Sequence, residues 1–162
     1  MLIAIYSVLS ILTPIKIENF KFTLEAFPIL VASLLLGPID GLIVGGVGSL
    51  VYQLLFSGYG ITATTLLWVL PHAISGLVVG LYASYMKYEL NFTKISFISI
   101  VSTIIVTMLN CLALYVDAKL YGYYSPTLVF SNIVIKLLTG IILAIIYSSV
   151  LPKLLNFLKK QF

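Results

Sequence analysis

The longest stretch of the chain without a formal charge covers residues 41–86, and a second covers residues 95–116. A helix needs about 20 apolar residues to cross the hydrocarbon core of a bilayer, so each stretch is long enough to span a membrane. Only 9% of the 162 residues are charged and 61% are hydrophobic, whereas charged residues make up about a quarter of a soluble domain. The sequence therefore excludes a soluble globular protein and indicates a membrane protein.

Turn residues and charges divide the chain into six apolar segments, which predict an all-α integral membrane protein with six transmembrane helices in a single domain, residues 1–162. The segments are expected at residues 1–13, 24–36, 40–56, 61–86, 95–115 and 127–158. The first two are shorter than a comfortable span, and the second is expected to lie among other helices. Pro152 is expected to kink the sixth helix or to let its end lie along the interface.

The distribution of lysines favours an orientation with both termini inside the cell. Five lysines would lie on the side of the termini and three on the opposite side, and cytoplasmic segments carry the excess of basic residues. Residues 14–24, 57–64 and 116–127 then form loops 1, 3 and 5 on the outer side. The sequence predicts an outward-facing ligand pocket between these loops and helices 4 to 6.

Small residues recur every fourth position in the third segment, at Gly37, Gly41, Gly45 and Ser49. Such stripes let helix backbones approach closely in a membrane, so helix packing is expected, with a moving or partner-binding surface as the alternative. The lysines are scattered and arginine is absent, which argues against a nucleic-acid surface. With one histidine and one cysteine in the chain, no metal site and no cofactor are expected.

Lys136 is the most unusual residue, because 16 uncharged residues flank it on each side, at 120–135 and 137–152. A charge at the centre of a membrane helix costs about 2.5–3.5 kcal/mol on insertion scales and is functional by default. Asn132 and Thr139 share its helical face. Three roles remain open for Lys136, namely contact with a ligand, an ion pair with Glu25 or Asp117, and snorkelling to the interface.

Trp68 and His72 lie four residues apart on the fourth segment, which opens with Thr62, Thr64 and Thr65. An indole and an imidazole on one helical face suit a flat heterocycle that is stacked and hydrogen-bonded. The alternatives are a tryptophan of the interfacial aromatic belt and a histidine whose ring is satisfied in the interior.

Further polar groups are expected near the outer ends of the helices. Asn110 and Asp117 share a face of the fifth segment, and four tyrosines fall within residues 115–124. This Tyr-rich segment is either a binding lid or an ordinary interfacial loop. Glu25 is either a ligand-facing carboxylate or an exposed charge at a helix start. The predicted ligand residues are Glu25, Tyr59, Thr65, Trp68, His72, Asn110, Asp117, Tyr121, Tyr123, Asn132 and Lys136.

Several stretches resemble the substrate-binding S components of energy-coupling factor (ECF) vitamin transporters. Residues 24–38 (LEAFPILVASLLLGP) and 39–49 (IDGLIVGGVGS) look like their helices 2 and 3. Residues 59–68 (YGITATTLLW) and 74–82 (ISGLVVGLY) are similar to their third loop and fourth helix, and Asn110 stands where the family often has an asparagine. Within the family the chain looks closest to the folate-type branch.

The resemblance implies a multi-pass protein of the bacterial cytoplasmic membrane that captures a vitamin with high affinity from outside. Its partners would be the shared ECF transmembrane coupling subunit and two ATPase subunits, which hydrolyse the ATP. Docking to the coupling subunit would use small residues of helix 1, for which the candidates are Ala4, Ser7 and Ser10. Gly41 and Gly45 of the third segment are further docking candidates. The usual pair of small residues four apart on helix 1 is replaced here, because Val8 follows Ala4.

The absence of arginine bears on the identity of the cargo. A folate carries two carboxylates, for which Arg is the natural partner, so a less anionic aromatic ligand suits the chain at least as well. Two other functions remain open on the sequence. One is a small intramembrane enzyme with His72 as its base, and the other is a structural membrane assembly protein.

Overall fold

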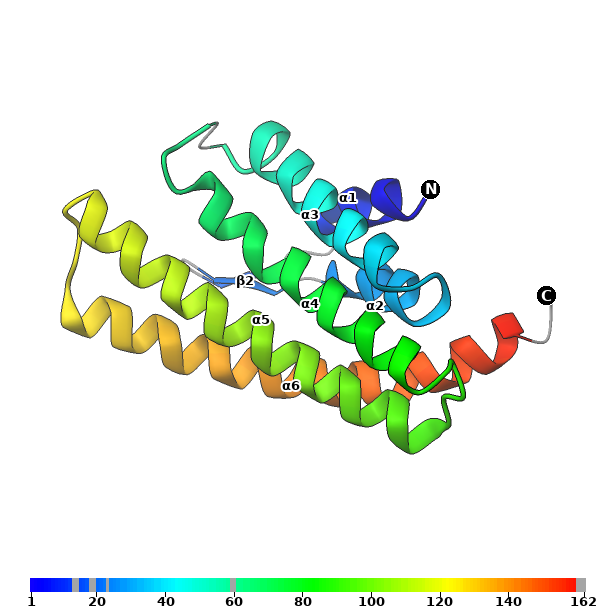
Figure 1. Cartoon of the computed structure of the whole chain (residues 1–162). Helices are drawn as coiled ribbons and strands as arrows, with labels where there is room; N and C mark the ends of the chain where they lie inside the picture. Colours follow the sequence, from blue (N-terminus) through cyan, green and yellow to red (C-terminus); the bar gives the residue numbers. More distant parts are fainter. Residues whose placement is uncertain (13–14, 18–19, 23, 59–60, 160–162) are drawn as a thin grey trace.

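The computed structural model describes residues 1–12, 15–17, 20–22, 24–58 and 61–159 (Figure 1). Within these residues the chain forms six helices and one short antiparallel hairpin. The elements are α1 (Leu2–Leu12), β1 (Ile15–Ile17), β2 (Phe20–Phe22), α2 (Ala26–Leu35), α3 (Pro38–Leu55), α4 (Thr65–Tyr85), α5 (Phe92–Leu120) and α6 (Pro126–Lys159).

The six helices confirm the all-α class, and the sequence did not predict the short hairpin that accompanies them. β1 and β2 pair antiparallel, with Ile15 opposite Phe22, Lys16 opposite Lys21 and Ile17 opposite Phe20. Both strands alternate apolar and lysine residues, and that period of two is typical of a strand. The hairpin connects α1 to α2, and β2 packs against α6.

α2 is the most deeply buried helix, as its short length predicts. Every residue from Pro28 to Leu34 is buried, and the helix contacts α1, α3, α4 and α6. It ends at Leu35 with Leu36 as its C-cap, and Gly37 then adopts a φ of 118°, a left-handed conformation that glycine accepts without strain. Pro38 starts α3 immediately afterwards, so α3 begins two residues before residue 40, where the third apolar segment was expected to start.

Backbone-to-backbone contact holds α3 against α4. A Cβ atom added to Gly76 would lie 2.1 Å from the carbonyl oxygen of Gly41, and one added to Gly41 would lie 2.6 Å from the carbonyl oxygen of Gly76. Gly45 meets the backbone of His72 in the same way. The stripe of small residues thus serves helix packing, which is the first of the two roles considered for it from the sequence.

Among the described residues, four helical segments are long and apolar enough to cross a membrane: α3, α4, α5 and Ile133–Leu155 of α6. α1 and α2 are shorter apolar helices of 11 and 10 residues. Both chain termini lie at one end of the bundle, whereas the α3–α4 and α5–α6 connections lie together at the other end (Figure 1). The fold therefore places two of the three predicted outer loops side by side.

Candidate ligand-binding site

Lys136 on α6 and Trp68 on α4 meet across the bundle. The Nζ atom of Lys136 lies 5.2 Å from the centroid of the indole ring, which is within the range of a cation–π interaction. Lys136 is also close enough to Glu25 and Cys111 to interact electrostatically with both. The lysine thus faces the interior of the bundle, in agreement with the general location of charges in membrane helices.

Glu25 and His72 form the second pair of the site. Nε2 of His72 lies 3.5 Å from Oε1 of the Glu25 carboxylate, and Ser10 donates a hydrogen bond of 2.9 Å to Oε2 of the same group. The side chain of His72 is 9% exposed and that of Glu25 is 17% exposed. Glu25 is therefore a largely buried carboxylate with partners, not an exposed charge at a helix start.

α4 is the element that orders these groups. Thr64, Trp68 and His72 stand on successive turns of one helical face. At His72 the backbone of α4 lies directly against Gly45 of α3, because a Cβ atom added to Gly45 would lie 2.3 Å from the carbonyl oxygen of His72. This contact holds the face of α4 in place. α4 thus presents a hydroxyl, an indole and an imidazole at spacings of about 6 Å along its axis.

A separate polar cluster joins the start of α4 to the end of α5. The Asp117 carboxylate accepts one hydrogen bond from the Thr64 hydroxyl and another from the Tyr123 hydroxyl. Thr65, also predicted for the site, accepts a hydrogen bond of 2.8 Å from the Thr62 backbone N–H. The neighbouring tyrosines pack on α5, where Tyr124 meets Tyr115 edge-on with ring centroids 5.7 Å apart. Asp117 therefore ties the α5–α6 connection to α4.

Tyr123→Phe is expected to loosen this connection without disturbing the bundle. A hydrogen bond to a charged group contributes about 1.5–3 kcal/mol, so local opening of residues 121–125 should rise about 10-fold or more. Chymotrypsin cleavage in this segment measures the opening, because proteolysis follows the population of the open form. Tyr85→Phe, at the far end of α4 where the side chain is 81% exposed, is the control. Equal cleavage rates for wild type and Tyr123→Phe would contradict the inference that Tyr123 anchors the α5–α6 connection through Asp117.

The remaining predicted ligand residues are less closely tied to this arrangement. Asn110 is half-buried on α5 and Tyr121 is exposed at the α5–α6 connection. Tyr59 and the side chain of Asn132 lie outside the described residues. The structure thus brings Glu25, His72, Trp68 and Lys136 into one neighbourhood and gathers Asp117 and Tyr123 at the end of the bundle.

The residues predicted for docking divide between the surface and the interior. Ala4 is exposed and Ser7 is half-buried, with its hydroxyl donating to the Ile3 carbonyl at 3.1 Å. Ser10 faces inward, because it is 1% exposed and bound to Glu25. Gly41 and Gly45 are buried in the α3–α4 contact, so in this conformation they present no surface to a partner.

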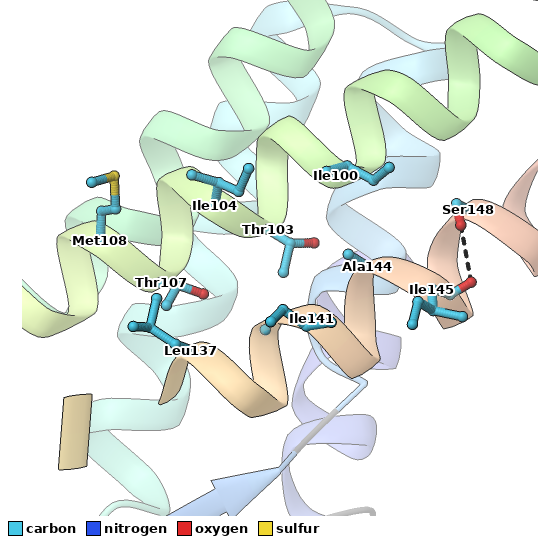
Figure 2. A pocket seen from close by; sticks show the side chains of 11 residues that line it. Ile100, Thr103, Ile104, Thr107, Met108, Leu137, Ile141, Ala144, Ile145 and Ser148 are labelled. Carbon is cyan, nitrogen blue, oxygen red and sulfur yellow. Dashed lines mark hydrogen bonds between the residues drawn. The ribbon is translucent and has the colours of Figure 1, made fainter. Parts of the chain in front are cut away.

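A groove of about 360 Å³ runs between α5 and α6 (Figure 2). Its walls include apolar side chains such as Ile104, Met108 and Ile141. Gly140 also lines it, and a Cβ atom added there would lie 2.7 Å from the Thr107 hydroxyl. Among the predicted ligand residues whose side chains the structure describes, none lines it. The groove therefore lies apart from the polar site.

Tyr6 and Ser10 are the site residues that the sequence analysis did not assign to ligand binding. The Tyr6 ring meets the His72 ring edge-on, with centroids 5.8 Å apart and planes at 82°. The one available signal was their spacing of four residues, which puts two polar side chains on one face of an otherwise apolar helix.

Comparison with known proteins agrees with this architecture. Residues 1–156 match the family described as "ECF-type riboflavin transporter, S component". A UPF0397 protein of Streptococcus pneumoniae (strain Hungary19A-6) is 34% identical over 74 residues, which cover 46% of this chain and 38% of that relative. The resemblance to ECF S components is thereby confirmed, whereas the folate-type branch stays a prediction.

An S component is a multi-pass protein of the cytoplasmic membrane that binds substrate and has no enzymatic activity or cofactor of its own. The family is a substrate-binding component of a transporter, which argues against an intramembrane enzyme with His72 as its base. Because the match extends over nearly the whole chain, the protein belongs to the family of ECF-type riboflavin transporter S components.

Proposed function

We propose that this chain is the high-affinity substrate-binding subunit of an ECF-type ABC importer, and that it captures a vitamin or related aromatic heterocycle from outside the cell. The observation that carries the proposal is the meeting of Lys136 and Trp68 beside the Glu25–His72 pair. Together these groups offer a ring face, a cation and a carboxylate within one membrane bundle. Pockets for small molecules combine apolar walls with a few such placed polar groups.

The charges of the site favour a cargo of low net charge. Lys136 and Glu25 carry opposite charges and interact with each other, so this pair supplies no strong excess of positive charge for a dianion. A folate, the first choice from the sequence, would need partners for two carboxylates, and the chain contains no arginine. A flavin-like ring system has a planar face for Trp68 and polar edges for Lys136 and Glu25. We therefore rank a neutral heterocycle above a folate.

In this proposal the cargo enters from the end where the α3–α4 and α5–α6 connections lie, with both termini in the cytoplasm. The bond from Tyr123 to Asp117 would close the α5–α6 connection over the bound molecule. The exposed side of α1, which includes Ala4, Ile5 and Val8, would contact the shared coupling subunit. Two ATPase subunits would drive release to the cytoplasm.

Mass spectrometry of what co-purifies with the protein tests the identity of the cargo. Protein isolated in mild detergent from cells grown in rich medium should release, on denaturation, a planar heterocycle in near-stoichiometric amount. Lys136→Met protein purified in parallel should release far less of the same compound. Recovery of a lipid or a sugar in place of a heterocycle, in equal amounts from both proteins, would contradict the proposal.

A further inference from the structure

Helix α1 contributes two buried polar side chains to the neighbourhood of Glu25. Tyr6 and Ser10 are each 1% exposed, and their spacing of four residues places them on the inner face of the helix. The opposite face carries exposed residues, including Ile5 and Val8. α1 therefore has a buried face and an exposed face, and the buried face carries polar side chains where it meets the candidate site.

Of these two side chains, Ser10 forms a hydrogen bond to the Glu25 carboxylate. Ser10 donates to Oε2 of Glu25 at 2.9 Å, and a hydroxyl has one proton to donate. Tyr6 stands one helical turn before Ser10 on the same face of α1. The other carboxylate oxygen of Glu25 faces Nε2 of His72 at 3.5 Å.

The aromatic ring of Tyr6 is the second contact between α1 and this group of residues. Its edge-on contact with the His72 ring places the aromatic group against the imidazole that Glu25 also contacts. The α3 backbone supports the ring, because a Cβ atom on Gly48 would lie 2.8 Å from it. Tyr6, Ser10, Glu25 and His72 thus meet from α1, from the residue before α2 and from α4.

We propose that Tyr6 and Ser10 are positioning residues of the binding site, which hold the Glu25 carboxylate and, through it, the orientation and tautomer of His72. A buried carboxylate is costly unless it is hydrogen-bonded, and a partner on one ring nitrogen of a histidine decides which nitrogen carries the proton. The consequence for cargo affinity rests on the proposed function, whereas the effect on His72 does not.

The single histidine of the chain makes this proposal measurable without any ligand. In protein labelled with ¹⁵N-histidine and purified in detergent, the ring nitrogen resonances belong to His72 alone and report its tautomer and hydrogen bonding. Ser10→Ala should move these resonances toward the positions seen in Glu25→Gln. Tyr6→Phe, which removes the hydroxyl but keeps the ring that contacts His72, should move them less than Ser10→Ala does.

Two variants separate positioning from a general effect on folding. Ser10→Thr keeps the hydroxyl and should restore the wild-type His72 resonances. Ser7→Ala removes a hydroxyl of the same helix that donates to the Ile3 carbonyl, and it should leave the His72 resonances unchanged. Wild-type resonances in a folded Ser10→Ala protein would overturn the proposal, as would equal displacement by Ser10→Ala, Ser10→Thr and Ser7→Ala.

Riboflavin binding extends the test to the function of the site. Ser10→Ala should weaken riboflavin binding about 5- to 10-fold, and the same change should have little further effect in a Glu25→Gln background, because coupled residues are not additive. Independent, fully additive losses would overturn the role of Ser10 through Glu25. Failure of the wild type to bind riboflavin or any related heterocycle would contradict the proposed function, and the His72 resonances would still decide the positioning role.

Discussion

Lys136→Met is expected to weaken binding of the heterocyclic cargo about 10- to 100-fold while the protein stays folded. Methionine keeps the approximate length and apolar stem of lysine but removes the ammonium group that faces Trp68 and Glu25. A hydrogen bond from a charged group contributes about 1.5–3 kcal/mol, which corresponds to this range of affinity. Equilibrium dialysis with radiolabelled riboflavin measures the loss.

The thermal stability of the same variant distinguishes binding from structure. A charged side chain in a membrane helix costs free energy, so Lys136→Met without cargo should melt at the wild-type temperature or above it. Lys153→Met removes an exposed lysine of the same helix and should leave both affinity and melting temperature unchanged. A Lys136→Met protein that binds cargo as well as wild type would show that the lysine serves only the fold.

Gly76→Ala is expected to cause the largest loss of stability among single-methyl additions. The added Cβ would lie 2.1 Å from the Gly41 carbonyl oxygen and 3.1 Å from the Ile29 side chain, so α3 and α4 have to separate. Overpacking costs typically 1–3 kcal/mol and occasionally more, and backbone contact leaves no flexible side chain to yield. We expect a loss of about 3 kcal/mol and a clearly lower melting temperature in detergent.

Gly46→Ala is the matched control for this substitution. Its Cβ would lie 3.5 Å from the Cβ of Ala73, which is ordinary van der Waals contact on the same pair of helices. Gly46→Ala should therefore melt within a few degrees of wild type. Equal destabilisation by Gly46→Ala and Gly76→Ala would mean that helix propensity, not close approach, controls stability at these glycines.

Much of the helical framework was predictable, because uncharged runs and turn dipeptides act locally. The burial of short α2, the stop at Gly37–Pro38 and the packing of the glycine stripe follow from residue types along the chain. The hairpin was missed, although the sequences Ile-Lys-Ile and Phe-Lys-Phe around Glu18 and Asn19 show the period of two that marks strands. Charges in that segment indicated exposure and obscured the pattern.

The contacts of the candidate site were only partly predictable. Helical spacing correctly places Trp68 and His72 on one face of α4, and an isolated lysine in an apolar run draws attention to Lys136. Which residues meet across helices depends on rotation and depth, which are set by packing between elements distant in sequence. The contact of Lys136 with the Trp68 ring and the bond from Ser10 to Glu25 therefore required the structure.

Titration of the fluorescence of Trp68, the single tryptophan of the chain, tests the central claim most directly. Purified protein is mixed with riboflavin, with folic acid and with other vitamins and nucleobase-like compounds, after removal of any co-purified molecule. We predict a saturable change in Trp68 emission for at least one heterocycle, with a neutral ring system preferred to folic acid, and a loss of that change in Lys136→Met. An emission that changes with no compound in the panel, while the protein remains folded, would contradict the assignment of this site to cargo binding.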